Sequence, residues 1–410
     1  MANTKVSQLP EYSGNPTGGY SVFNNSGETT TYKIKNYNLF GANNTDAGSI
    51  FPFFVGSGNT AGGGVGATHI IGIGNNISAG ASRGDNGGCM AVGHNNTNTD
   101  PYAGNSLVVG QDNTGNGHNS IVFGRYNSVP YGYAGMVGGY QNTSNNEGGI
   151  IVSQNGTING FNNAMLGGRF NQLLGYAGGI GGTENNGMLG GYYNNLTGGI
   201  QSSIIGGQYN LISGQQFGDL DRCYYSSILG GNNNNIGQFV TGSTIIGSAY
   251  STISGTSATT INSNILGGSN NIIGSLSNVQ MIGCSDRTAT ASATTYVENL
   301  RVFRQAQYGN YNNGSTATNY TIDWNNGNIQ KVVLTGSCVF SATNITDGTT
   351  YIFKVEQDNS GNRAATWSSG IFKFANSTPP TLSTGANDVD IFTFVAMDGL
   401  LYGVAQLNFR

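Results

Sequence analysis

The stretch SIIGGQYN at residues 203–210 decides the fold, because the same phrase recurs through the middle of the chain. It consists of a small residue, two apolar residues, usually a Gly, then a Gly, two variable residues and an Asn. Clear copies start at Ser106, Ser120, Ala164, Ser227 and Asn264. Self-similarity at a short period is the signature of a stacked repeat architecture.

The repeat predicts strands and corners rather than helices. The second Gly recurs at intervals of mostly 14 to 17 residues, and an apolar residue follows the Asn two positions later. Gly pairs and β-branched doublets are both unfavourable inside helices. Each period therefore predicts two short strands, with corners where Gly and Asn tolerate positive φ. The predicted corner glycines are Gly93, Gly110, Gly124, Gly139, Gly168, Gly191, Gly207, Gly231 and Gly268.

These periods predict an all-β chain whose middle part is a parallel β-roll or β-helix solenoid. Each coil bonds through its backbone to the coils above and below, at a spacing of about 4.8 Å. About thirteen such coils make a shaft of roughly 60 Å. Longer gaps between copies are interpreted as loop insertions on an otherwise regular coil.

Each coil carries an apolar doublet, and neighbouring residues of a strand point to opposite faces. One residue is therefore expected to fill the coil interior while the other points outward. The doublets predicted as coil core or inter-chain contacts are Ile204 and Ile205, Ile228 and Leu229, Ile245 and Ile246, and Ile265 and Leu266. A monomer would expose a long apolar stripe, which predicts a homo-oligomer with rotational symmetry. The doublets do not distinguish two chains from three.

The composition excludes several function classes. Of the 410 residues, 68 are Gly and only 8% are charged, with a net charge of −4. So few cations provide no basic stripe for nucleic acid. Membrane insertion and export are not expected, because the sequence shows neither a spanning apolar run nor the apolar core of a signal peptide. The four cysteines lie far apart, so reduced, semi-buried thiols are expected and no cofactor or metal is predicted.

Three regions are predicted along the chain. Residues 1–60 form a polar lead-in, residues 65–290 form the repeat shaft, and residues 296–410 form a separate β domain of sandwich-like type. The expected aromatic core of that domain contains Phe340, Tyr351, Phe353, Trp367, Phe372, Phe392 and Phe394. The lead-in holds one hairpin, which is marginal in water and is expected to dock on another protein. Its candidate docking residues are Tyr20, Val22, Phe23, Tyr32 and Ile34.

The repeat resembles the head repeats of trimeric autotransporter adhesins. The resemblance lies in the Ser-apolar-apolar-x-Gly phrase and in the period, and it covers about half of the chain. It implies a left-handed parallel β-roll shared by three chains. The sequence departs from that family where those proteins have a signal peptide and a C-terminal membrane anchor.

The flanking segments resemble bacteriophage fibre proteins instead. TKVSQLP at residues 4–10 is similar to virion-attachment segments, and YVENLRV at 296–302 is similar to the connector that follows β-roll regions. Residues 320–410 resemble a C-terminal β domain of phage virion proteins. These resemblances imply a homotrimer that is made in the host cytoplasm and lies on the virion surface, anchored by its N-terminus to another virion protein.

Candidate metal-binding and sugar-binding residues have simple structural interpretations. His69, His94 and His118 lie 25 and 24 residues apart, so three-fold stacking could gather one set, but solvated turn residues are the simpler interpretation. Tyrosines near the coil corners could stack on sugars, but shielding of the solenoid flank is simpler. These tyrosines are Tyr140, Tyr192, Tyr193, Tyr209 and Tyr250.

Candidate catalytic carboxylates are also few. Cleavage of a glycan needs two carboxylates that face one bond. The close pairs are Asp219 with Asp221, in a loop insertion, and Asp388 with Asp390, where a solvated strand edge is the simpler interpretation. The sequence therefore predicts a non-enzymatic head or tail fibre of a phage, which contacts the host surface and has host-surface glycan as a candidate partner. The alternatives are a tailspike-type glycan depolymerase and a bacterial surface adhesin.

Overall fold

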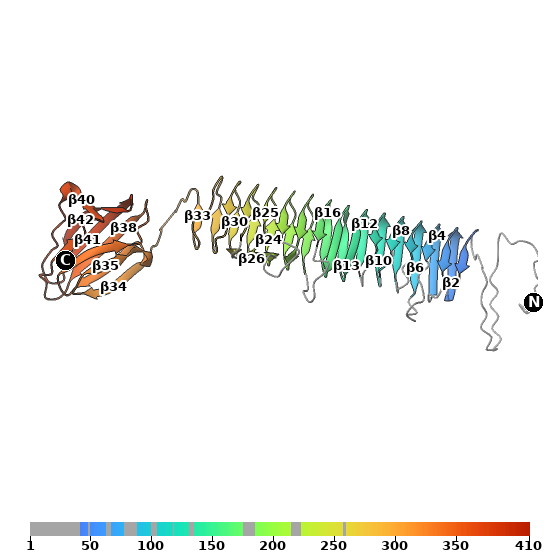
Figure 1. Cartoon of the computed structure of the whole chain (residues 1–410), viewed down its shortest axis with the longest axis horizontal. Coiled ribbons are helices and arrows are strands. Elements are labelled where there is room, and N and C mark those ends of the chain that lie inside the picture. Colours follow the sequence, from blue (N-terminus) through green and yellow to red (C-terminus); the bar gives the residue numbers. More distant parts are fainter. Residues whose placement is uncertain are drawn as a thin grey trace, which may run out of the picture. The chain divides into compact units, whose positions relative to one another are not determined.

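The computed structural model describes residues 42–47, 50–62, 67–77, 88–99, 105–117, 119–130, 135–174, 185–214, 223–256 and 260–410. Its elements fall into two compact units, divided between Leu300 and Arg301. The first unit is a parallel β-solenoid and the second is a domain with a mixed sheet (Figure 1). The predicted all-β class and the predicted solenoid are confirmed.

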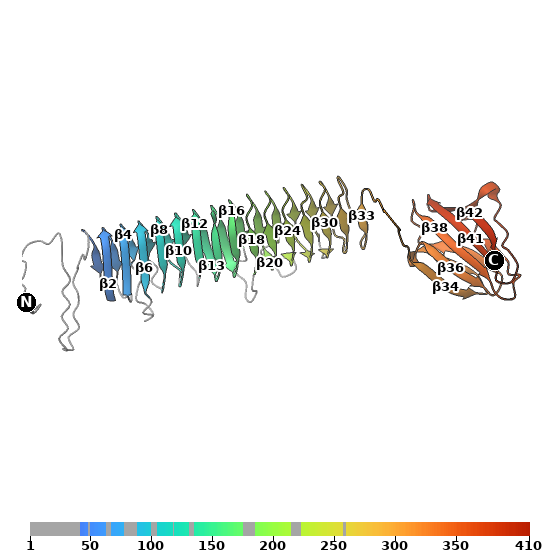
Figure 2. The same cartoon turned by 180° about the vertical axis from the view of Figure 1, so that it is seen from behind.

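Two long parallel sheets form the solenoid, and successive coils stack their strands in both (Figures 1 and 2). Sheet A contains β2 (Ile50–Ser57), β4 (Ala67–Ile73), β6 (Cys89–His94), β8 (Leu107–Gln111), β10 (Ile121–Arg125), β12 (Met136–Tyr140), β14 (Ile150–Gln154), β16 (Ala164–Arg169), β18 (Gly187–Leu189), β21 (Ser203–Ile205), β24 (Ser227–Leu229), β27 (Thr244–Ile246), β30 (Asn264–Leu266), β32 (Gln280–Ile282) and β33 (Thr295–Val297). At about 4.8 Å per strand, these 15 strands span roughly 65 Å.

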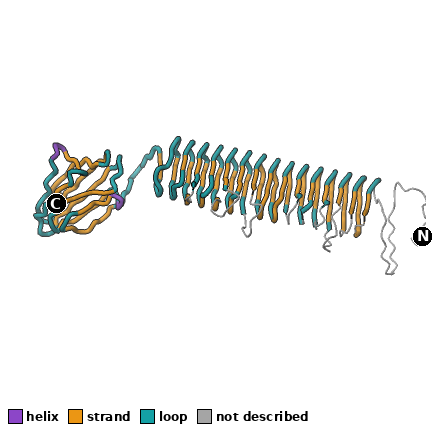
Figure 3. The backbone as a smooth tube through the Cα atoms, viewed as in Figure 1, coloured by secondary structure: helices purple, strands orange, loops and turns teal. Residues whose placement is uncertain are grey.

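Sheet B lies on the other side of the coil interior. It contains β1 (Thr45–Ala47), β3 (Thr60–Gly62), β5 (Asn76–Ile77), β7 (Thr97–Asn98), β9 (Thr114–Gly115), β11 (Ser128–Val129), β13 (Thr143–Glu147), β15 (Thr157–Phe161), β17 (Gln172–Leu174), β19 (Asn195–Thr197), β22 (Leu211–Ser213), β25 (Asn235–Ile236), β28 (Thr252–Ile253) and β31 (Ile272–Ile273). Figure 3 shows its strands and those of sheet A in orange, joined by teal loops that repeat from coil to coil.

The coil changes its form along the shaft. A register shift between Val152 and Gln154 separates coils that turn at one positive-φ Gly, such as Gly124, from coils that turn at a Gly pair, such as Gly206 and Gly207. The later coils also form a third, short parallel sheet. Its strands are β20 (Gly199–Ile200), β23 (Cys223–Tyr224), β26 (Val240–Thr241) and β29 (Thr260–Ile261).

Alternation along the strands builds the solenoid core. In β21, Ile204 is fully buried while Ile205 is 44% exposed. The other three doublets behave alike, with Ile228, Ile245 and Ile265 buried and Leu229, Ile246 and Leu266 exposed. Sheet B contributes the facing column of buried residues, for example Ile212 and Ile236. The coil interior is therefore two stacked columns of apolar side chains.

A row of buried asparagines bonds each coil to its neighbours. The side-chain amide of Asn127 donates to the carbonyl oxygens of Phe123 and Gly139, at 2.8 Å each. Its oxygen accepts from the backbone N–H and the side-chain amide of Asn142 in the next coil, at 3.0 Å each. This Asn ladder consists of Asn44, Asn59, Asn75, Asn96, Asn113, Asn127, Asn142, Asn171, Asn194, Asn210, Asn234 and Asn271. It gives the corner carbonyls a side-chain donor; in the later coils, carbonyls such as that of Gly207 also accept a backbone N–H from the preceding coil.

The predicted corner glycines have two reasons to be Gly. All nine have positive φ: Gly93, Gly110, Gly124, Gly139, Gly168, Gly191, Gly207, Gly231 and Gly268. In addition, a Cβ on Gly207 would collide with the Asn210 amide and lie 2.6 Å from the carbonyl oxygen of Gly231. The ladder Asn three residues later therefore occupies the space that a corner side chain would need.

Corner and ladder residues change together. Ser153 and Ser248 occupy two of the corners, and neither has positive φ. Three residues after them stand Gly156 and Ser251 instead of Asn. The Ser153 hydroxyl donates to the Asn142 oxygen at 2.6 Å, and the Ser248 and Ser251 hydroxyls are 2.6 Å apart. In these two coils the ladder position has no Asn amide, and the hydroxyl of the corner Ser forms a hydrogen bond there instead.

The shaft is longer than predicted. The boundary at 60 to 65 is corrected by β1 and β2, which pair in parallel with β3 and β4 and so belong to the first coils. At the other end, β33 extends the shaft beyond residue 290. The missed signal is the spacing of Gly56 and Asn59, which is that of a corner Gly and its ladder Asn.

The second unit begins with the solenoid pattern and ends with antiparallel strands. Its six-stranded sheet has the order β34 (Asn310–Thr316), β36 (Ile329–Leu334), β38 (Thr350–Gln357), β41 (Val389–Met397), β42 (Leu400–Phe409) and β40 (Phe372–Phe374). Its three-stranded sheet contains β35 (Tyr320–Asp323), β37 (Cys338–Thr343) and β39 (Ala365–Trp367). Strands β34 to β39 alternate between the sheets in parallel pairs, whereas β41 pairs antiparallel with β38 and β42. Short helices η2 (Trp324–Asn326) and η3 (Ala375–Ser377) follow β35 and β40.

The two sheets of this unit enclose an aromatic core. The rings of Phe340 and Phe353 lie 5.2 Å apart between centroids, and those of Trp367 and Phe392 lie 4.5 Å apart. All seven aromatic residues expected in this core are buried: Phe340, Tyr351, Phe353, Trp367, Phe372, Phe392 and Phe394. The unit therefore has a core of its own, distinct from the columns of the solenoid.

Substitutions at Gly206 and Gly207 distinguish the energetic cost of positive φ from the cost of a steric collision. Both have positive φ, but a Cβ on Gly206 would meet open space. We expect Gly206→Ala to destabilise each chain by about 1 to 2 kcal/mol, the cost of left-handed backbone. Gly207→Ala adds a collision and should destabilise by about 3 kcal/mol or more. Urea unfolding followed by circular dichroism measures the difference, and equal midpoints would show that the ladder does not crowd the corner.

Asn127→Ala tests the Asn ladder directly. The substitution removes five side-chain hydrogen bonds, among them the donors to the carbonyls of Phe123 and Gly139 and the acceptor of the buried Asn142 N–H. We expect a loss of about 2 to 4 kcal/mol per chain in the same unfolding experiment. Gln111→Ala, at a half-buried corner position, is the control and should change stability by less than about 0.5 kcal/mol. Similar losses for both variants would contradict the role of the ladder.

Candidate interaction surfaces

One apolar row runs along the outward face of sheet A. We call it the outer row; its members are register partners from β2 to β33. They are Val55, Ile71, Val92, Val109, Phe123, Gly138, Val152, Leu166, Leu189, Ile205, Leu229, Ile246, Leu266, Ile282 and Val297. Even at Gly138 the row is apolar, because the Phe123 ring occupies the space where a Cβ would lie.

A second row flanks the outer row, two residues earlier on each strand. In the first coils it is largely apolar, with Phe53, Met90, Ile121 and Ile150 exposed. After Ala164 it becomes polar. The polar members are Ser203, Ser227, Thr244, Asn264, Gln280 and Thr295. The exposed apolar surface is therefore two residues wide at first and one residue wide in the later coils.

Aromatic residues gather at the coil corners. The rings of Phe170, Tyr193 and Tyr209 stack from coil to coil, with centroids 4.8 and 5.5 Å apart. Tyr192 stands across this stack, 4.5 Å from Tyr193 at an interplanar angle of 83°. Tyr250 is 59% exposed. The aromatic residues thus cover the flank of the solenoid while leaving much of their own surface in solvent.

Asp388 and Asp390 act as structural hydrogen-bond acceptors. Both are buried, which corrects the expected solvated edge. Asp390 accepts from the backbone N–H and hydroxyl of Ser383 and from the N–H of Asn408. Asp388 accepts from the N–H of Gly385 at 2.6 Å and from Nε of Arg410 at 3.1 Å. Their oxygens hold a loop and the last strand together, whereas Asp219 and Asp221 lie outside the described residues.

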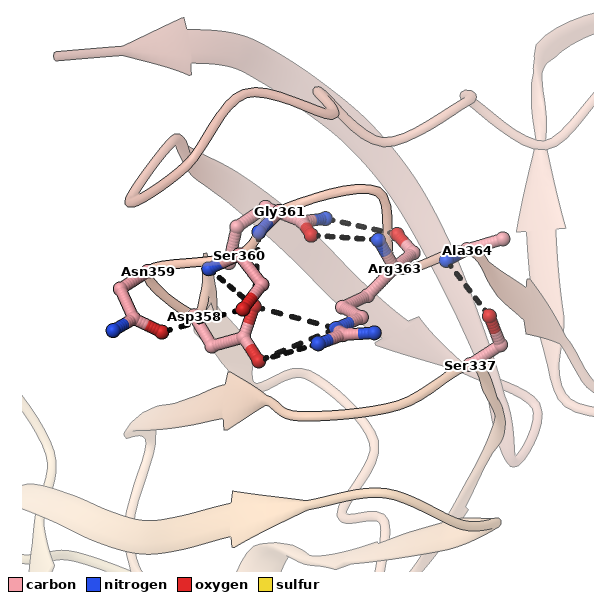
Figure 4. Close-up of polar contacts among 8 residues, drawn as sticks. Ser337, Asp358, Asn359, Ser360, Gly361, Arg363 and Ala364 are labelled. Atoms are coloured by element: carbon pink, nitrogen blue, oxygen red, sulfur yellow. Dashed lines mark hydrogen bonds and ion pairs between the residues drawn. The ribbon is translucent and has the colours of Figure 1, made fainter.

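In the second unit, the charged side chains of the turn at residues 358–363 likewise form hydrogen bonds within the turn (Figure 4). Asp358 accepts from the N–H groups of Ser360 and Gly361 and forms an ion pair with Arg363 at 2.8 Å. The hydrogen bond from Arg363 holds the pKa of Asp358 below its usual value. The side chain of Gln357 bonds to both backbone groups of Arg363. These contacts close the turn and leave no carboxylate poised for acid–base chemistry here.

The histidines and cysteines are dispersed. His69 lies in the flanking row of sheet A and His94 at a corner, while His118 falls outside the described residues. Across the described part of the chain, no group of three or more His, Cys, Asp or Glu is placed to hold a metal ion. The four cysteines are unpaired and buried rather than semi-buried. Burial raises the pKa of Cys223 to about 12 and that of Cys338 to about 11, so both thiols stay protonated at neutral pH.

The candidate anchor residues cannot be placed on the fold. Tyr20, Val22, Phe23, Tyr32 and Ile34 lie outside the described residues. No helix among the described residues is long and apolar enough to span a membrane.

Comparisons with known proteins assign no family. No protein-family model matches this chain, and no curated protein sequence matches it.

Proposed function

We propose that this chain is the subunit of a non-enzymatic, homotrimeric fibre on the outside of a bacteriophage particle. The observation that carries the proposal is the outer row, which keeps an apolar residue facing outward through all 15 strands of sheet A. Soluble monomers rarely expose a continuous apolar surface of this length. Covering each half-exposed Leu or Ile contributes about 1 kcal/mol, and the gain repeats in every coil.

The shape of the apolar surface favours three chains over two. In the later coils, strands of three residues such as β21 place one apolar residue outward, with a polar residue two positions before it. Two sheets packed face to face need apolar faces several residues wide. A three-fold axis needs only one residue per coil from each chain, and it leaves the flanking Ser and Thr residues at the wetter margin.

Light scattering on a charged variant tests the assembly. We expect the wild-type chain to have three times the 42.6 kDa mass of one chain. Leu229→Lys combined with Ile246→Lys places two charges per chain on the outer row and should shift the protein towards the monomer. Gln208→Lys combined with Ser269→Lys, on coil corners, is the matched control and should leave the trimer intact. A monomeric wild-type chain at tens of micromolar would contradict the proposal.

The placement on a phage particle rests on the resemblance of the flanking segments to phage fibre proteins. In this arrangement the N-terminal region binds another virion protein and the C-terminal unit points outward to contact the host. The hydrogen bonds of Asp388, Asp390 and Asp358 support a structural rather than a glycosidase function for these carboxylates. A depolymerase remains the outcome to exclude, by incubating the protein with host capsular glycan and measuring the chain length.

Deletion of residues 1–40 tests the anchor. The shaft described here starts after that segment, so the truncated chain should still fold and assemble. We expect it to be missing from purified particles, whereas immunogold labels the full-length chain on the head or the tail. Deletion of residues 320–410 should leave the fibre on the particle with weaker host contact. Normal copy numbers of the chain that lacks residues 1–40 would refute the assignment of the anchor.

A further inference from the structure

A ridge of paired residues runs along the corners of the coils. We call it the corner ridge; it consists of the two residues that follow each corner Gly. The first residue of each pair continues the pairing between coils, as Arg125 does with Tyr140 and Arg169 with Tyr192. The second residue has a φ between 51° and 57° in every coil from Asn95 to Asp286. Side chains at equivalent positions are therefore stacked along the shaft.

Several ridge residues are aromatic where the backbone favours Asn. Other coils place Asn95, Asn155, Asn233 and Asn270 at the positive-φ position, as expected for the residue that tolerates it best. Five coils place a bulky ring there: Tyr126, Phe170, Tyr193, Tyr209 and Tyr250. Such strain persists where another interaction outweighs it, and it concentrates at functional positions. Ring stacking accounts for Phe170, Tyr193 and Tyr209, which leaves Tyr126 and Tyr250 to be explained.

One arrangement of three side chains occurs twice on the ridge. Arg125 lies over the ring of Tyr126, 4.6 Å from its centroid, and Tyr140 of the next coil meets that ring edge to face at 5.9 Å. In the same way, Arg169 lies 4.7 Å from the centroid of Phe170.

Tyr192 completes the second copy. It meets Phe170 edge to face at 6.0 Å, as Tyr140 meets Tyr126. Arg125 and Arg169 are separated by three coils, or roughly 14 Å along the shaft.

The arginines of both copies have no acidic partner among the described residues, although Arg125 also donates to the Tyr126 hydroxyl at 3.1 Å. Arg125 and Arg169 are exposed, and within the described ranges neither forms an ion pair. The nearest acid on the ridge is Asp112, one coil before Tyr126, and its carboxylate already accepts a hydrogen bond from Asn95. Only 8% of the residues are charged, so two guanidinium groups without an ion pair on one ridge produce a locally positive electrostatic potential.

The residues between the two copies narrow the class of ligand. Gln141 and Gln154 lie there, and both are neutral amides that donate and accept hydrogen bonds. A nucleic acid carries a phosphate at every nucleotide and calls for a continuous row of cations, which this ridge does not have. An acidic polysaccharide instead has hydroxyl groups for the amides, C–H faces for the tyrosine rings and a carboxylate on spaced residues for the arginines.

We propose that the corner ridge from Arg125 to Tyr209 binds an acidic polysaccharide that lies along the shaft. Arg125 and Arg169 bind carboxylates three coils apart, Tyr140 and Tyr192 contact sugar rings, and the glutamines bond to hydroxyl groups. The assignment deepens the proposed fibre function, since it places contact with a host-surface glycan on the shaft as well as at the tip.

Binding of oligogalacturonate, a chain of acidic sugars, tests the proposal on the full-length protein. Calorimetry should detect binding that weakens with salt, with dextran as the neutral comparison. Arg125→Gln combined with Arg169→Gln should reduce the affinity by about 10-fold or more, because charge-assisted hydrogen bonds are lost. Tyr140→Ala combined with Tyr192→Ala should reduce it as well. Equal melting temperatures of variant and wild-type proteins verify that the fold is kept.

Matched controls lie outside the ridge segment from Arg125 to Tyr209. Arg287→Gln combined with Tyr225→Ala removes an exposed cation and a 59% exposed ring away from the two copies, and should bind as wild type does. Absence of oligogalacturonate binding, equal binding by the ridge variants, or tighter binding of dextran or single-stranded oligonucleotide would overturn the proposal. These outcomes are independent of the virion labelling: a chain that is found on particles but does not bind the probe refutes the ridge alone.

Discussion

The side chain of the buried ladder Asn is the contact on which the shaft depends. Each coil turns within a few residues, and its corner carbonyls accept a side-chain amide, in several coils beside a backbone N–H of the preceding coil. The amide of Asn127 reaches the carbonyls of Phe123 in its own coil and of Gly139 in the next. Because Asn113 accepts from Asn127 and Asn127 from Asn142, the bonds run from coil to coil inside the solenoid, with breaks in the row of amides only at Gly156 and Ser251 among the described coils. Such linked bonds polarise one another and hold every coil at the same height.

The outward surfaces follow from this internal constraint. Corner glycines are needed because the amide lies where their side chains would be, and the exchange at Ser153 and Ser248 shows that the two positions form one unit. Uniform coil height then places equivalent residues directly above one another. Both the outer row and the corner ridge are continuous for that reason, although one is aliphatic and the other aromatic and polar.

Features with a local period were predictable from the sequence, and features that depend on distant contacts were not. Strand alternation predicted that one residue of each doublet is interior and the other faces outward, and the structure places Ile204 inside and Ile205 on the surface. Positive φ at Gly207 also follows from local rules, but its closeness to Gly231 involves the next coil. The early start at β2 was missed because Pro52 stands where most clear copies of the phrase have Ser or Ala, four residues before the corner Gly. Burial of Asp390 depends on Ser383 and Asn408, which no period connects.

The Phe123 ring over Gly138 interrupts an otherwise uniform row. Aliphatic side chains that repeat at every coil fit a neighbouring chain almost equally well when that chain slides by one coil, so most of the outer row carries no information about alignment. The large Phe123 ring beside Gly138, which has no side chain, makes one coil of the outer row different from all the others. For copies packed on this row around a three-fold axis, chains in register bring their Phe123 rings to one level. A slip of one coil would instead set a ring at the level of a neighbour's Gly138 or Val109, so this pair distinguishes the alignment in which all the chains end together from a slipped one.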